Sequence, residues 1–126
     1  MNNGKKRILV IDDESSITRL LKLNLEQTNK YVVRVENAST HAFVAAEEFK
    51  PDLILLDVMM PGKDGGELAG SFQASTKFHG VPIVFLTAAV KKKEVSAAGG
   101  LIGGLPFIAK PVNLRELVGC LERLAV

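Results

Sequence analysis

Hydrophobic residues gather in five short runs along the chain, and longer mixed stretches separate them. Three of the runs, at 8–11, 53–56 and 83–86, are apolar without alternation, which is typical of central strands covered on both faces. The pattern therefore predicts five strands. Their sequences are RILVI (7–11), YVVRV (31–35), DLILL (52–56), PIVFL (82–86) and PFIAK (106–110).

Two of the stretches between and after these runs show the spacing of an amphipathic helix. The first is SITRLLKLNLEQT and the second is NLRELVGCLERL near the C-terminus. Their apolar residues at helical spacing are Ile17, Leu20, Leu21 and Leu25 in the first, and Leu114, Leu117, Val118 and Leu121 in the second.

The middle of the chain carries weaker helical signals. Residues 40–49 form one candidate helix, and residues 66–75 form another. Asp64, which precedes the second, and Glu67 three residues later resemble a capping box. A fourth helix should close near residues 97–106, where four glycines make it intrinsically weak. Alternation of strands and helices predicts an α/β fold, a parallel sheet with helices on both faces.

Composition narrows the class of protein. With 126 residues, 47% of them hydrophobic, the sequence predicts a single domain over residues 1–126. The net charge of +2 and the small basic patches at 5–7 and 91–93 argue against direct nucleic-acid binding. One cysteine, Cys120, excludes an internal disulfide. The first residues resemble neither a signal peptide nor a membrane span, so we expect a cytoplasmic protein without membrane contact.

Polar side chains follow most of the predicted strands, at the edge where ligands bind in open α/β sheets. The second strand ends in Glu36 and Asn37, which predict no particular role. The other four tips carry Asp12-Asp13-Glu14, Asp57, Thr87 and Lys110-Pro111.

Such a set of groups suits phosphoryl transfer. Several carboxylates at one edge repel one another unless a proton or a cation intervenes, and oxygen ligands favour Mg²⁺. A carboxylate such as Asp57 can act as a nucleophile and form an aspartyl phosphate. Transfer then needs a metal, a fixed cation and a hydrogen-bond donor. Asp13 would bind the metal, Lys110 would be the cation and Thr87 would be the donor.

Four sequence segments together resemble the receiver domain of the two-component response-regulator family. They are ILVIDDE, PDLILLDVMMPGKDG, VPIVFLTA and FIAKP, in family order and spacing. The resemblance implies a flavodoxin-like, doubly wound, five-stranded parallel sheet of order 2-1-3-4-5 with five helices. That order would place the first and third strands side by side, and Asp13 near Asp57.

The resemblance also implies a function and a role for each site residue. The domain would accept a phosphoryl group from a histidine kinase or a histidine phosphotransfer protein and switch a protein-interaction surface. It would be a signalling domain of a phosphorelay rather than an enzyme, although it would assist its own phosphoryl transfer and dephosphorylation. The implied roles are phosphoacceptor for Asp57, Mg²⁺ ligands for Asp12, Asp13, Asp57 and the Met59 carbonyl, phosphoryl binding for Thr87, charge neutralisation for Lys110, a conformational switch for Thr87 and Phe107, and a cis peptide at Pro111.

Three departures from the family pattern accompany this resemblance. Phe107 stands where many relatives have tyrosine, the segment from Thr87 to Gly103 is one residue longer, and Met59 and Ala89 occupy positions that influence phosphoryl lifetime. The sequence leaves open the cognate kinase, the downstream protein, and whether this chain acts alone or with an output domain.

Three other functions remain as alternatives. A flavin- or nucleotide-binding protein would need a phosphate-binding loop free of acids after the first strand, where this chain has Asp12-Asp13-Glu14. A Mg²⁺-dependent phosphatase with an aspartate nucleophile typically needs a second acid at the position of Met59. A docking module that never accepts phosphate would not need Asp13, Asp57, Thr87 and Lys110 together.

Overall fold

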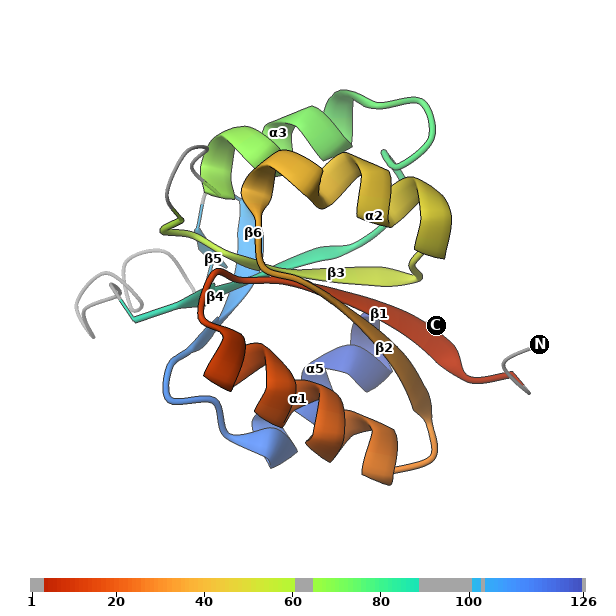
Figure 1. Ribbon diagram of the computed structural model, residues 1–126, viewed down its shortest axis with the longest axis vertical. Helices are drawn as coiled ribbons and strands as arrows, with labels where there is room; N and C mark the ends of the chain where they lie inside the picture. Colours follow the sequence, from red (N-terminus) through yellow and green to blue (C-terminus); the bar gives the residue numbers. More distant parts are fainter. Residues whose placement is uncertain (1–3, 61–64, 89–100, 103, 126) are drawn as a thin grey trace.

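A six-stranded sheet forms the centre of the computed structural model, which describes residues 4–60, 65–88, 101–102 and 104–125. The strands lie in the order β2-β1-β3-β4-β6-β5 (Figure 1). Their bounds are β1 (Lys6–Ile11), β2 (Tyr31–Glu36), β3 (Leu53–Asp57), β4 (Ile83–Thr87), β5 (Leu101–Ile102) and β6 (Leu105–Ala109).

Five of these strands are parallel, and they confirm the predicted order 2-1-3-4-5, with β6 as the fifth predicted strand. The fold is flavodoxin-like. Strand β1 lies between β2 and β3, so that Ile11 pairs with Glu36 on one side and with Leu56 on the other. The ends of β1 and β3 are therefore neighbours.

The sixth strand, β5, corrects the sequence analysis, which placed the end of a helix near residues 97–106. Residues 101–102 instead pair antiparallel with β6, and Ile102 lies opposite Leu105. Only residues 103 and 104 connect the two strands, and Gly104 has a φ of 85°, which favours glycine. Gly104 therefore supports a hairpin here.

Helices cover both faces of the sheet (Figure 1). In the described residues, α1 (Ser15–Gln27) and α5 (Leu114–Leu124) lie on one face, and α2 (Ala42–Phe49) and α3 (Gly65–Ala74) lie on the other. A short 3₁₀ turn (Ser39–His41) precedes α2. The part of the predicted fourth helix that precedes residue 101, the capping residue Asp64 and the basic patch at 91–93 fall outside the described residues. No helix within the described ranges is long and apolar enough to cross a membrane.

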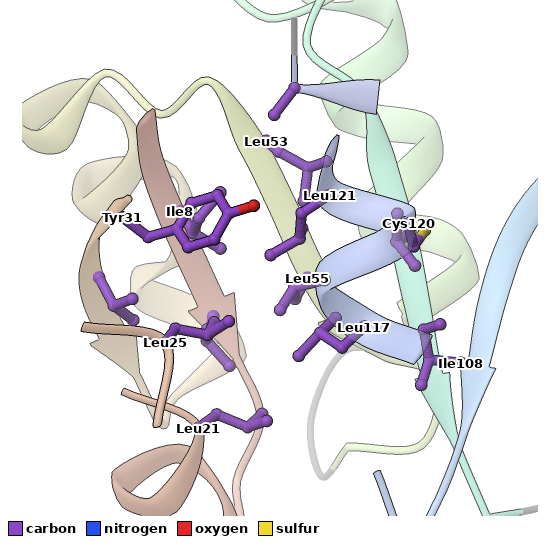
Figure 2. Packing of buried hydrophobic residues seen from close by; sticks show 14 of the residues in the cluster. Ile8, Leu21, Leu25, Tyr31, Leu53, Leu55, Ile108, Leu117, Cys120 and Leu121 are labelled. Carbon is purple, nitrogen blue, oxygen red and sulfur yellow. The ribbon is translucent and has the colours of Figure 1, made fainter. Parts of the chain in front are cut away.

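Alternate residues of the central strands enter two separate cores. On the α1 and α5 face, Leu117 and Leu121 of α5 pack with Ile8 and Leu55 of the sheet, and Leu25 of α1 joins the same cluster (Figure 2). The opposite core holds Leu9, Ile54 and Leu56 with residues of α2 and α3. Every residue of β3 and β4 is buried, which explains their unbroken apolar runs.

Two leucines of the predicted apolar helix faces do not lie in these cores. Leu20 of α1 is 57% exposed, and Leu114 at the start of α5 is 37% exposed. Both contribute to the lining of a pocket of about 190 Å³ between α1 and the loop that leads into α5. Helical spacing therefore located these helices correctly but overstated the width of their buried faces.

Candidate functional site

The C-terminal ends of four strands bring the predicted polar residues together at one edge of the sheet. Asp57 ends β3 opposite Leu86, and Thr87 ends β4 opposite Ala109. Asp12, which follows β1, is fully buried, and Asp57 and Thr87 are only 4% and 2% exposed. A cleft of about 300 Å³ opens over this edge and is lined by Glu14, Asp57, Met59, Ala88 and Lys110.

Three carboxylates converge at this edge. One oxygen from each of Asp12, Asp13 and Asp57 lies within 4.8 Å of the others. Opposite ligands of an octahedral Mg²⁺ lie about 4.2 Å apart, because each bond is about 2.1 Å long. The cluster therefore has the size and the oxygen chemistry of a Mg²⁺ site, and the exposed Asp13 leaves one side open to water.

Lys110 supplies the positive charge of the site. Its Nζ lies 2.8 Å from Asp12 Oδ2, 3.2 Å from Glu14 Oε1 and 3.6 Å from Asp57 Oδ1, and its side chain is only 9% exposed. Burial works to lower the pKa of Lys110, but the hydrogen bond and charge of Asp12, followed by Asp57 and Glu14, raise it above its usual value. The lysine is therefore charged at neutral pH.

The backbone of the Lys110 segment is held next to β4. The Lys110 N–H donates to the Thr87 carbonyl at 2.9 Å, and the Lys110–Pro111 peptide bond is cis, at the position that the family resemblance implies. The hydrogen bond holds the Lys110 backbone against the end of β4, and the lysine side chain reaches Asp12 after β1 and Asp57 at the end of β3.

Asp57 is an unusual carboxyl group because it is buried beside another acid. Burial raises its pKa, and the charge of Asp12 raises it further, to about 6. Lys110 and the Met59 N–H, which donates to Asp57 Oδ1 at 3.3 Å, act in the opposite direction. An unperturbed aspartate has a pKa of about 3.9, so ionisation of the Asp57 carboxyl group is less favourable in the folded protein than in the unfolded chain.

This shift predicts a pH-dependent effect of Asp57→Asn in metal-free buffer. Between about pH 4 and pH 6 the folded protein holds a proton that the unfolded chain has released, so stability falls as the pH rises through this window. Near pH 7.5, Asp57→Asn should raise the free energy of unfolding by about 1–3 kcal/mol, because it removes the buried charge. Near pH 4 the gain should vanish. Urea unfolding in EDTA at the two pH values measures both, and an equal gain at both would contradict the charge argument.

Gly65, which the sequence did not single out, packs against the backbone of Asp57 and Val58. Gly65, at the start of α3, donates its N–H to the Val58 carbonyl at 2.9 Å. A Cβ at this position would overlap the carbonyl oxygen of Asp57 and lie only 2.7 Å from Val58 Cα. Only glycine allows α3 to approach the end of β3 this closely.

Asn37 was also assigned no role from sequence, yet it contacts the acidic loop, residues 12–14 between β1 and α1. Its side-chain amide donates to the Asp12 carbonyl at 2.7 Å and to Thr18 Oγ1 at 3.0 Å. The strand order could have indicated this contact, because β2 lies next to β1 and the residues at its end must adjoin Asp12.

The two residues of the expected switch lie on neighbouring strands. Phe107 pairs with Phe85 in the β4–β6 register, and Thr87 lies two residues further along β4. The Phe107 ring is half-buried and packs against the core under α2 and α3. Met59, whose carbonyl was expected to bind metal, has a 69% exposed side chain at the rim of the cleft.

The fold and this cluster of acids with one lysine define a class of protein, and comparison with known families agrees. Residues 8–122 match the response regulator receiver domain, and the chain belongs to this family. Receiver domains are the signalling modules of two-component systems. They generally bind Mg²⁺, which the acidic cluster suits.

Similar curated proteins are response regulators. The chain is 38% identical over 119 residues to the DNA-binding response regulator MtrA of Mycobacterium tuberculosis, covering 94% of this chain and 50% of that protein. It is 39% identical over 119 residues to the phosphate regulon transcriptional regulatory protein PhoB of Pseudomonas aeruginosa, covering 93% and 50%. The chain thus spans about half the length of these relatives.

Similar solved structures are response regulators and receiver domains. A putative response regulator from Chloroflexus aurantiacus matches with a TM-score of 0.82 at 27% identity, covering 96% of this chain and 98% of that one. The chemotaxis protein CheY4 of Vibrio cholerae matches with a TM-score of 0.80 at 26% identity, covering 95% and 98%.

Proposed function

We propose that this chain is a phosphoacceptor that takes a phosphoryl group on Asp57 in the presence of Mg²⁺. The observation that supports this most strongly is the placement of Asp57: a buried carboxylate beside Asp12, Asp13 and Lys110, at the floor of an open cleft. Neither nucleotide binding nor a docking role alone requires a carboxylate in this position.

In the proposed reaction, an Asp57 carboxylate oxygen attacks phosphorus and the bond from phosphorus to the donor nitrogen breaks. The bonding electrons leave with the imidazole of a phosphohistidine, which takes up a proton. Lys110 would neutralise charge on the phosphoryl oxygens, and the Thr87 hydroxyl would donate a hydrogen bond to one of them. Bound Mg²⁺, held by Asp12, Asp13, Asp57 and the Met59 carbonyl, would supply further charge neutralisation.

The proposed donor is a histidine kinase or a histidine phosphotransfer protein, and the proposed location is the cytoplasm. Phosphorylation would draw Thr87 toward the phosphoryl group and let Phe107 pack into the vacated space, shifting the population of a protein-interaction surface. The recipient is a downstream protein or an output domain. The domain itself would not contact nucleic acid, whereas the relative MtrA is named as DNA-binding.

A small phosphodonor tests this function without a known kinase. We expect acetyl phosphate with Mg²⁺ to add the mass of one phosphoryl group to the intact protein, and acetyl phosphate with EDTA to add none. Absence of any adduct with Mg²⁺ would contradict the proposed function.

The metal site makes a separate prediction about thermal stability. Mg²⁺ at ten times its Kd should add about 1.4 kcal/mol to the free energy of unfolding, because it binds the folded protein alone. Asp13→Asn should lose most of this gain, because it removes one of the carboxylates that would bind the metal. Asp13 is the exposed member of the cluster and contributes little to the core, so the substitution should leave the fold intact. Thermal melts of both proteins in EDTA and in Mg²⁺ provide the comparison. A wild-type melting temperature that does not respond to Mg²⁺ would exclude the site.

A further inference from the structure

We infer that Asn37 is a positioning residue for the Mg²⁺ site, and that it acts by fixing the peptide between Asp12 and Asp13. This inference rests on the proposed function, and it extends the site to β2, which contributes none of the proposed metal ligands. It follows from two hydrogen bonds made by one side-chain amide.

The first hydrogen bond controls the direction of Asp13. Asn37 Nδ2 donates to the Asp12 carbonyl at 2.7 Å, and that carbonyl belongs to the planar peptide that joins Asp12 to Asp13. Fixing this plane fixes the position of Asp13 Cα, from which the side chain extends. Asp13 is exposed, so its orientation depends strongly on the backbone that carries it. Asp12, by contrast, is also held by the Glu14 N–H at 2.9 Å and by Lys110.

The second hydrogen bond ties the same amide to the helix that follows the loop. Asn37 Nδ2 lies 3.0 Å from Thr18 Oγ1, and the Thr18 hydroxyl donates to the Ser15 carbonyl at 3.1 Å in the first turn of α1. Thr18 is only 1% exposed, so this contact is not on the open surface. One amide, on the residue that follows β2, therefore connects Asp12 at the start of the acidic loop to Thr18 in the first turn of α1.

The chemistry of these contacts requires an amide donor. The Asp12 carbonyl can only accept, and the Thr18 hydroxyl uses its single proton toward Ser15, so both bonds need the two N–H groups of Asn37. Groups that orient metal ligands in this way commonly affect metal affinity without touching the metal.

The test measures Mg²⁺ affinity by calorimetry, well below the melting temperature, for four variants and the wild type. Asn37→Ala should weaken Mg²⁺ binding roughly three- to tenfold, the equivalent of one or two hydrogen bonds. Thr18→Val should also weaken Mg²⁺ binding. Thr18→Ser, which keeps the hydroxyl, should bind Mg²⁺ with wild-type affinity. The matched control is Thr28→Val, because the Thr28 hydroxyl makes a similar bond to the Leu25 carbonyl at the far end of α1.

Affinity separates positioning from a purely structural role. If Asn37 only stabilised the fold, Asn37→Ala would lower the melting temperature in EDTA and leave the Kd for Mg²⁺ within twofold of wild type, which would overturn the inference. Equal weakening by Thr28→Val would overturn it as well. A wild-type protein that does not bind Mg²⁺ would overturn the proposed function, and this inference with it.

Discussion

Asp57→Asn is expected to accept no phosphoryl group from acetyl phosphate and Mg²⁺. The variant keeps the shape of the side chain but removes the nucleophilic oxygen, and Asp57 is the carboxylate at the floor of the cleft. The expected loss is complete rather than partial, because no other group can form the same acyl phosphate at this position. Intact mass measured over a time course gives the labelled fraction.

The matched control is Asp52→Asn. Asp52 precedes the same strand at its opposite end, where its carboxylate accepts a hydrogen bond from the Arg7 backbone N–H at 2.8 Å. This variant should be labelled like the wild type. Labelling of Asp57→Asn at the wild-type level would show that the acceptor is a different residue.

Lys110→Met is expected to have the largest effect on stability in metal-free buffer. It leaves the buried carboxylates of Asp12 and Asp57 without the ammonium group that lies 2.8 Å and 3.6 Å from them. Removing one partner of a buried ion pair typically costs about 3 kcal/mol or more, so we expect a loss of this size at neutral pH. Mg²⁺ should recover much of it, because the metal neutralises the same oxygens. Chemical unfolding with and without Mg²⁺ measures both effects.

An exposed lysine provides the control for this variant. Lys77 lies 3.5 Å from Glu47, but the two side chains are 66% and 52% exposed. Lys77→Met should therefore change stability by no more than about 1 kcal/mol and leave the response to Mg²⁺ unaltered. A Lys110→Met protein as stable in EDTA as the wild type would contradict the role of this lysine in balancing the acids.

Most of the fold follows from local patterns in the sequence. The unbroken apolar runs of β3 and β4 require strands covered on both faces, and the helical spacing of Leu117 and Leu121 locates α5. Strand order does not follow from such patterns, because any parallel order would bury the same residues. It came from the family resemblance, and it is the order that brings β1 and β3 together.

The remaining features depend on contacts between distant segments. Asn37 is separated by 25 residues from the carbonyl that it binds, and nothing in its neighbours along the chain indicates that bond. Gly65 is required by the approach of α3 to Asp57, which only the packed structure defines. Leu20 satisfies the helical pattern, yet it is 57% exposed, because it borders the pocket between α1 and the loop into α5 and not the packed core.

The most direct test of phosphoryl transfer to Asp57 is to locate the phosphoryl group in the wild-type protein. Borohydride reduces an aspartyl phosphate to homoserine, so protein treated with acetyl phosphate and Mg²⁺ can be reduced, digested and mapped by mass spectrometry. We expect homoserine at residue 57 and unmodified aspartate at residues 12 and 13, with no homoserine when EDTA replaces Mg²⁺. Homoserine at residue 12 or 13, or an unmodified residue 57 in protein that carries the added mass, would contradict transfer to Asp57.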